Sequence, residues 1–144
     1  MTDFAHMISL MAKQTATIAA CIFIFGCGGN TGPAMGTVHG RVTLDGSPLG
    51  NAMVVFTPEH GRPANSMTNE NGEYSLVYSQ SAKGAAVGQY TVQITTGREE
   101  GYAEGVKVSD AVKEVVPDKY NSKSELKVEV KAGDNVHNFD LQSK

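Results

Sequence analysis

The feature that most constrains this chain is an alternation of apolar and polar residues with a period of two, which begins at Thr37. Because successive side chains of a β-strand point to opposite faces, this alternation is typical of strands with one buried face. Turn residues interrupt it roughly every 8–16 residues, which leaves room for about seven short strands. These predicted strands cover residues 37–44, 51–57, 64–68, 73–79, 88–95 and 125–131 and a last segment around Phe139 and Leu141. The sequence therefore predicts an all-β domain, either a sandwich or a barrel.

The turn residues and the inward faces of these strands can be assigned individually. Asp45-Gly46 ends the first strand and predicts a hairpin turn, because both positions tolerate a positive φ. Residues 69–72 (NENG) predict a second tight turn. The residues expected to point inward are Val38, Gly40, Val42 and Leu44; Tyr74, Leu76 and Tyr78; Tyr90, Val92 and Ile94; and Leu126, Val128 and Val130. Residues 97–124 are less regular and more polar, and the only hint of a helical period, over 110–115, is too short to define a class.

Charge excludes one class of partner. The formal net charge is −3, and no stripe of basic residues interrupts the chain. Nucleic-acid binding depends on clustered lysine and arginine that neutralise phosphates, so a nucleic-acid partner is not expected.

An apolar run over residues 15–26 (TATIAACIFIFG) precedes Cys27. A membrane-spanning helix needs about 20 apolar residues, so this run is too short to span and has the length expected of a signal peptide. Lys13 is the basic residue in front of it. Translation could start at Met1 or at Met11, since the segment from Met11 is a compact signal by itself.

The end of this run resembles the bacterial lipobox, in which an aliphatic, a variable and a small residue precede a cysteine. Here these are Ile24, Phe25, Gly26 and Cys27. The small residue lets the signal peptidase accommodate its cleavage site, and the cysteine thiol takes a diacylglycerol through a thioether. Fatty acyl chains such as palmitate would then hold the protein on a membrane, each buried CH₂ contributing about 0.8 kcal/mol. The alternative is that Cys27 is a free thiol after an ordinary signal or anchor.

Lipidation at Cys27 implies three segments. Residues 1–26 form a cleaved lipoprotein signal peptide, residues 27–36 a lipidated flexible tether rich in glycine, and residues 37–144 the β domain. Cys21 would leave with the signal, so the mature chain would hold a single cysteine and no intrachain disulfide. The expected location is the cell membrane or the outer membrane, facing the periplasm or the exterior.

Residues 40–50 (GRVTLDGSPLG), followed by AMVVFTP and TNENGEYSL, carry a resemblance to a known family. The order of turn and core residues resembles the carboxypeptidase regulatory-like domain, a seven-stranded Greek-key β-sandwich of the transthyretin (prealbumin) type. The matching residues are Gly40, Val42, Asp45, Gly46, Pro48, Leu49, Ala52, Val54, Phe56, Thr68, Asn71, Gly72 and Tyr74. GQYTVQI matches the family's next strand, and the C-terminal stretch resembles small bacterial lipoproteins with this one domain.

The resemblance implies a cell-envelope accessory or binding module without activity of its own. Its motifs are turn and core residues, so they bear on fold far more than on function. Transthyretin-like folds include a hydrolase of 5-hydroxyisourate, which uses histidines, an arginine and a C-terminal Tyr-Arg-Gly-Ser motif. This chain ends FDLQSK and lacks that motif. We therefore expect no enzyme, no catalytic residue and no cofactor.

Metal sites are not expected either. His39, His60 and His137 are far apart, at no spacing typical of ligands, and are interpreted as surface residues. Residues 69–73 offer oxygen atoms that could suit calcium, but they lack the length and the closing glutamate of an EF-hand loop. An Asn-Gly pair between two strands is better explained as a turn.

Tyr102 and Tyr120 are the candidate binding residues, because they lie in the irregular segment 97–124 and not on a core-facing strand position. Exposed tyrosines can stack on sugars or anchor a protein partner; alternatively, these two cover an end or edge of the domain. The leading hypothesis is a lipid-anchored module that contacts another envelope protein or a polysaccharide through residues 97–124. The alternative is a carbohydrate-binding domain that uses the two tyrosines.

Overall fold

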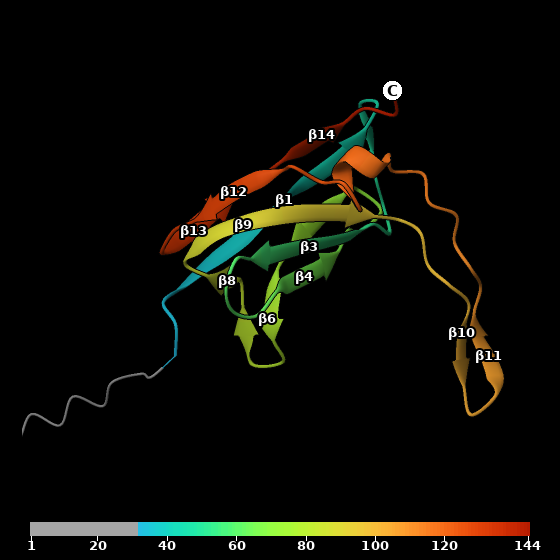
Figure 1. Cartoon of the computed structure of the whole chain (residues 1–144), viewed down its shortest axis with the longest axis horizontal. Coiled ribbons are helices and arrows are strands. Elements are labelled where there is room, and N and C mark those ends of the chain that lie inside the picture. The colour runs from blue at the N-terminus through green and yellow to red at the C-terminus, as the bar shows by residue number, and fades with distance from the viewer. Residues whose placement is uncertain (1–31) are drawn as a thin grey trace, which may run out of the picture. The chain divides into compact units, whose positions relative to one another are not determined.

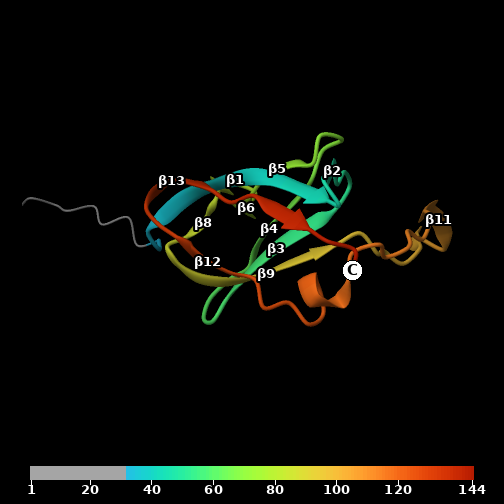
Figure 2. The same cartoon turned by 90° about the horizontal axis from the view of Figure 1, so that it is seen from above.

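The structure is a computed structural model that describes residues 32–144, and these form an all-β sandwich (Figures 1 and 2). The long strand β1 (Met35–Leu44) organises the first sheet. Along one edge β1 pairs with β13 (Gly133–Val136) and β14 (Phe139–Leu141). Its other partners are β2 (Ser47–Pro48), β5 (Glu73–Ser75) and β8 (Ala85–Ala86).

The second sheet has the strand order β12-β9-β3-β4-β6-β7. Its strands are β3 (Met53–Pro58), β4 (Ala64–Met67), β6 (Val77–Ser79), β7 (Ala82–Lys83), β9 (Gly88–Thr95) and β12 (Lys127–Val130). Strands β3, β4 and β6 follow one another as antiparallel neighbours, and β9 returns to lie beside β3. This spatial order is that of a Greek key. The predicted all-β sandwich is therefore confirmed.

The strand predicted over residues 73–79 divides between the two sheets. Its first half, β5, pairs with β1, and its second half, β6, pairs with β4. Leu76 lies at the crossing point: its N–H donates to the carbonyl of Val38, 2.9 Å away, and its side chain is fully buried. A strand that changes sheets closes one corner of the sandwich and leaves no gap in the core.

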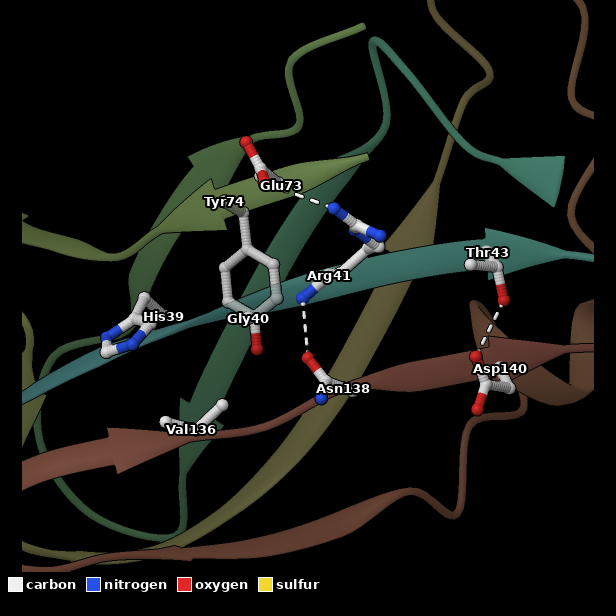
Figure 3. Close-up of a pocket in the computed structure, with 9 residues that line it drawn as sticks. All are labelled: His39, Gly40, Arg41, Thr43, Glu73, Tyr74, Val136, Asn138 and Asp140. Atoms are coloured by element: carbon white, nitrogen blue, oxygen red, sulfur yellow. Dashed lines mark hydrogen bonds and ion pairs between the residues drawn. The ribbon is translucent and has the colours of Figure 1, made fainter. Parts of the chain in front are cut away.

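The pairing of the first strand with the last is parallel and is interrupted at His137–Asn138 (Figure 3). The Asn138 side chain fills the interruption, since its Oδ1 accepts a hydrogen bond of 2.9 Å from the Arg41 N–H. A Cβ atom on Gly40 would lie 1.9 Å from the carbonyl oxygen of His137, so this position requires glycine. The Tyr74 side chain crosses Gly40 and its hydroxyl donates to the same carbonyl at 2.7 Å.

An aromatic cluster centred on Phe56 occupies the space between the sheets. The Phe56 ring lies 5.9–6.4 Å from the rings of its neighbours Tyr74, Tyr90, His137 and Phe139. Around it are Val38, Val42, Val54, Leu76, Val92, Ile94, Val130 and Leu141, all buried. The predicted inward faces are confirmed for Val38, Val42, Tyr74, Leu76, Tyr90, Val92, Ile94 and Val130, while Leu44, Tyr78, Leu126 and Val128 lie partly buried at the margin of the core.

The two predicted turns are formed by the residues expected. Asp45 and Gly46 have φ values of 51° and 81° and connect β1 to β2. In the second turn the Asn69 side-chain oxygen accepts hydrogen bonds from the N–H groups of Asn71 and Glu73, at 3.0 and 2.9 Å. The Asn69 oxygen is thus used by the turn itself, which supports the turn interpretation over a calcium loop.

The segment 97–124 contains more regular structure than its sequence suggests. It forms the hairpin strands β10 (Gly101–Ala103) and β11 (Val106–Ser109) and a short 3₁₀ helix, η1 (Asp118–Tyr120). The hint of a helix over residues 110–115 was wrong, because Val112 forms an antiparallel bridge with Arg98 there. Within residues 32–144, no helix has the length and apolar character needed to cross a membrane.

Replacing Thr68 by valine is expected to lower the free energy of unfolding by about 1–3 kcal/mol. Thr68 is buried; its Oγ1 donates to the Leu49 carbonyl at 2.6 Å and accepts from the Ala52 N–H at 2.9 Å. Valine has nearly the same shape but leaves both groups without their partner. Urea unfolding would measure the loss, with Thr57→Val on the exposed side of β3 as the matched control. Equal stability of the two variants would contradict this role.

Candidate functional site

The β10–β11 hairpin is the most prominent feature outside the sandwich. It projects beyond the end of β9, away from both sheets, in two perpendicular views (Figures 1 and 2). Its strands pair only with each other among the described residues. The described part of the chain begins, in blue in Figure 1, near β8 and β13 at the other end of the domain. The hairpin is therefore displayed at the end farthest from the N-terminal connection.

One side of the hairpin is a polar network centred on Glu100. The Tyr102 hydroxyl donates to Glu100 Oε2 at 2.8 Å, and Lys107 Nζ lies 3.0 Å from Glu100 Oε1 and 2.8 Å from an oxygen of Asp110. Lys107 and Tyr102 lower the pKa of the Glu100 carboxyl, and the bond to Glu100 raises the pKa of the Tyr102 hydroxyl. The Asp110 and Glu100 carboxylates raise the pKa of Lys107. At pH 7 the Glu100 carboxylate and the Lys107 ammonium are therefore paired in their charged forms, and the neutral Tyr102 hydroxyl donates to Glu100.

The opposite side of the hairpin is apolar. Tyr102 is paired with Lys107, and Ala103 with Val106, so alternation places Val106 and Val108 on the side away from the polar network. We call Val106 and Val108 the valine face. These side chains are 66% and 64% exposed, and no other described element covers them. These two exposed valines on a projecting strand are a candidate contact surface.

A carboxylate clasp holds the base of the hairpin segment. Glu114 Oε1 accepts hydrogen bonds from the N–H groups of Thr96 and Val116 and from the Thr96 hydroxyl, at 2.8–3.1 Å. Glu114 Oε2 accepts from the Gly97 N–H and the Thr95 hydroxyl. Burial alone would raise the pKa of this carboxyl, but the hydrogen bonds from Thr95, Thr96 and Val116 outweigh it and lower the pKa to about 2. Glu114 thereby joins the end of β9 to the chain that returns from the hairpin.

The two tyrosines predicted as binding residues have different surroundings. Tyr102 is 61% exposed on β10. Tyr120, at the end of η1, packs partly buried against the core, with Lys119 Nζ 5.0 Å from the ring centre. Its hydroxyl accepts the N–H of Gln142 at 3.2 Å. Tyr102 therefore offers an open ring, whereas Tyr120 covers the sandwich, as the alternative interpretation expected.

A shallow groove of about 540 Å³ runs along the outer face of the first sheet, over the interruption at His137–Asn138 (Figure 3). Arg41 Nη2 lies 3.2 Å from Glu73 Oε1, and the Thr43 hydroxyl donates to Asp140 at 2.7 Å. The groove is lined by polar outward residues of β1 together with the apolar surfaces of Tyr74 and Val136. The sequence did not point to it, since it depends on a kink in a strand distant along the chain.

A hydroxyl, an imidazole and a carboxylate meet beside this groove. Thr37 Oγ1 and His39 Nδ1 both contact Asp134 Oδ1, at 2.8 and 3.3 Å. Because the hydroxyl and the imidazole reach the same carboxylate oxygen separately, the three groups do not form the hydroxyl–imidazole–carboxylate series of a catalytic triad. Residues 32–144 also contain no group of three or more histidine, cysteine or acidic residues arranged to hold a metal ion.

The histidines differ in exposure. His39 and His60 are exposed, as predicted, but the interpretation of His137 as a surface residue was wrong. The kink between β13 and β14 turns its ring toward Phe56, and its Nε2 is enclosed without a hydrogen-bond partner. It contributes to the aromatic cluster.

The predicted lipidation site Cys27, the signal peptide over residues 1–26 and the first part of the tether lie outside the described residues. The described fold and surfaces define the class of the domain: an all-β sandwich with a projecting hairpin.

Comparison with known proteins adds little to this class. No protein-family model matches the chain. No curated protein matches it. Among solved structures, this chain is similar to a DUF3823 family protein from Parabacteroides merdae ATCC 43184, with 18% sequence identity and a TM-score of 0.40. The similarity covers 76% of this chain and 47% of that protein, so the chain spans less than half of its length.

Proposed function

We propose that this protein is a lipid-anchored module of the cell envelope that binds another envelope protein or polymer and has no catalytic activity of its own. The observation that carries the proposal is the hairpin, which exposes Tyr102 and the valine face at the end opposite Gly32. A domain held on a membrane through Cys27 would offer this surface to partners in the envelope. The lipobox over residues 24–27 supports the anchor.

We also propose that the domain is a carboxypeptidase regulatory-like domain. The residues of the motif have the structural roles that a turn-and-core motif requires. Asp45 and Gly46 form a positive-φ turn, Gly72 has a φ of 74°, and Phe56 and Tyr74 meet in the core. The proposal predicts an accessory role, since these residues specify fold and leave the binding surface to the loops.

The test of the binding function is in-cell crosslinking of the tagged full-length protein, followed by detergent extraction, pull-down and mass spectrometry. One recurrent envelope partner that is lost when Cys27→Ser is used as the unanchored control is the expected result. A purified protein with a turnover that one substitution abolishes would overturn the proposal.

The anchor itself has a separate prediction. Wild-type protein extracted in detergent is expected to carry acyl mass on a chain that begins at Cys27, and Cys27→Ser is expected to move most of the protein to the soluble fraction. The physical reason is that two or three acyl chains hold a protein on a membrane far more firmly than one. Intact-mass measurement and fractionation check both points. An unmodified, already soluble wild type would contradict them.

A carbohydrate-binding domain is the second candidate function, and the open ring of Tyr102 favours it. With Tyr120 packed on the core, Tyr102 would supply the stacking ring by itself. Under this function Tyr102→Ala abolishes binding on a glycan array, while Tyr120→Ala mainly lowers stability. Unchanged glycan binding by Tyr102→Ala would exclude it.

A further inference from the structure

We propose that the valine face docks into an apolar cleft bordered by basic residues on a partner protein. This inference rests on the proposed function and names the chemistry of its partner. It uses three properties of the hairpin: the exposure of its valines, its rigidity and its charge.

The valine face is a large unburied apolar surface for so small an element. Val106 and Val108 are about two-thirds exposed, and Ala103 lies beside Val106 on the same side. An isolated two-stranded hairpin buries little of its own surface, so its apolar side contributes little to folding. Burying the two valines against a partner would remove this area from water, which favours association.

The hairpin is held rigidly before any partner binds. The Glu114 clasp closes its base, and reciprocal hydrogen bonds of 2.8 and 2.9 Å join Arg98 to Val112 just above the clasp. Lys107 links Glu100 and Asp110 along the polar side. A surface that is already ordered loses less conformational entropy on binding, so these contacts favour a docking role.

The charge of the hairpin selects among occupants. Residues 98–110 contain four acidic and two basic residues, and two of the acidic ones, Glu100 and Asp110, are paired with Lys107 on the polar side. The acidic residues outside that network are Glu104, in the turn two residues before Val106, and Glu99, which is exposed. An acidic border disfavours a second copy of the same hairpin and an anionic lipid surface, because like charges repel. It is complementary to a cleft with a basic border.

The test places a photoreactive amino acid at single valines of the full-length protein in cells. Position 108 probes the valine face, and position 136, which is 58% exposed on the first sheet, is the matched control. We expect a discrete protein adduct from position 108 and none from position 136. The crosslinked peptide of the partner is expected to be apolar and flanked by lysine or arginine. The double variant Glu99→Lys/Glu104→Lys should reduce the adduct about tenfold by weakening electrostatic attraction.

The outcomes separate this inference from the proposed function. A protein adduct from position 136 and not from position 108 would show that the valine face is not the docking surface. It would leave the proposed binding function standing. An adduct at position 108 with lipid or with a second copy of this chain would overturn the proposal that the partner has an apolar cleft with a basic border. The absence of any adduct at both positions would overturn the inference and the proposed function together. The charge variant leaves Val106, Val108 and the Glu114 clasp unchanged. A weaker adduct from this variant would therefore report the loss of electrostatic attraction and not a disrupted hairpin.

Discussion

Phe56→Ala is expected to lower the free energy of unfolding by about 3–5 kcal/mol, the largest stability loss that we predict for this domain. Phe56 is fully buried on β3, and its ring lies within 6.4 Å of four other aromatic rings from β5, β9 and the β13–β14 segment. Alanine would remove the group that both sheets share and leave a cavity. Small domains are stable by only about 5–15 kcal/mol, so the loss is a large part of the total.

Urea or guanidinium unfolding measures this effect directly, as a shift in midpoint at an unchanged slope. Val55→Ala is the matched control, because Val55 precedes Phe56 on the same strand and faces the other side of the sheet. We expect the control to cost about 1 kcal/mol or less. Comparable losses in the two variants would mean that the aromatic cluster is not the centre of the core.

Much of this core is predictable from sequence because a period of two fixes which side chains share a face. Tyr74 and Leu76, or Tyr90 and Val92, are identified by alternation alone and are buried. The parallel pairing of β1 with β13 and β14, in contrast, could not be predicted from the sequence. It joins residues almost a hundred positions apart, and no local pattern encodes it. The inward rotation of His137 follows from the kink in that pairing, and so alternation could not reveal it.

The candidate binding surface was predictable only in part. Segment 97–124 stands out by its irregularity, and Tyr102 is exposed as its position suggests. The hairpin within it could have been found from Val-Lys-Val at residues 106–108, preceded by a glycine turn at Gly105, where φ is 81°. The role of Glu114 has no sequence signal. A single glutamate in a polar stretch is ordinarily a solvated surface residue, and only folding brings it to the threonines at the end of β9.

Glu114→Gln is expected to lower the free energy of unfolding by about 1–3 kcal/mol at pH 7 and to release the base of the hairpin segment, because donors lose their acceptor. Glutamine keeps the shape but replaces one acceptor oxygen with a donor that faces other donors. The amides of Arg98, Val112 and Val116, which depend on the clasp or lie beside it, should exchange with solvent faster than in wild type. Hydrogen–deuterium exchange measures this, with exposed Glu99→Gln as the control. Unchanged protection at these amides would show that the clasp does not order the segment.

The same carboxylate predicts how stability depends on pH. Its pKa is about 2 in the folded protein and about 4.5 when the chain is unfolded, so the unfolded state binds the proton more readily. The stabilisation from Glu114 is therefore complete above pH 4.5 and is lost as the pH falls toward 2. Thermal unfolding of wild type and Glu114→Gln should differ most above pH 5 and converge near pH 2. Curves that stay equally far apart at every pH would assign the loss to packing of the side chain and not to its charge.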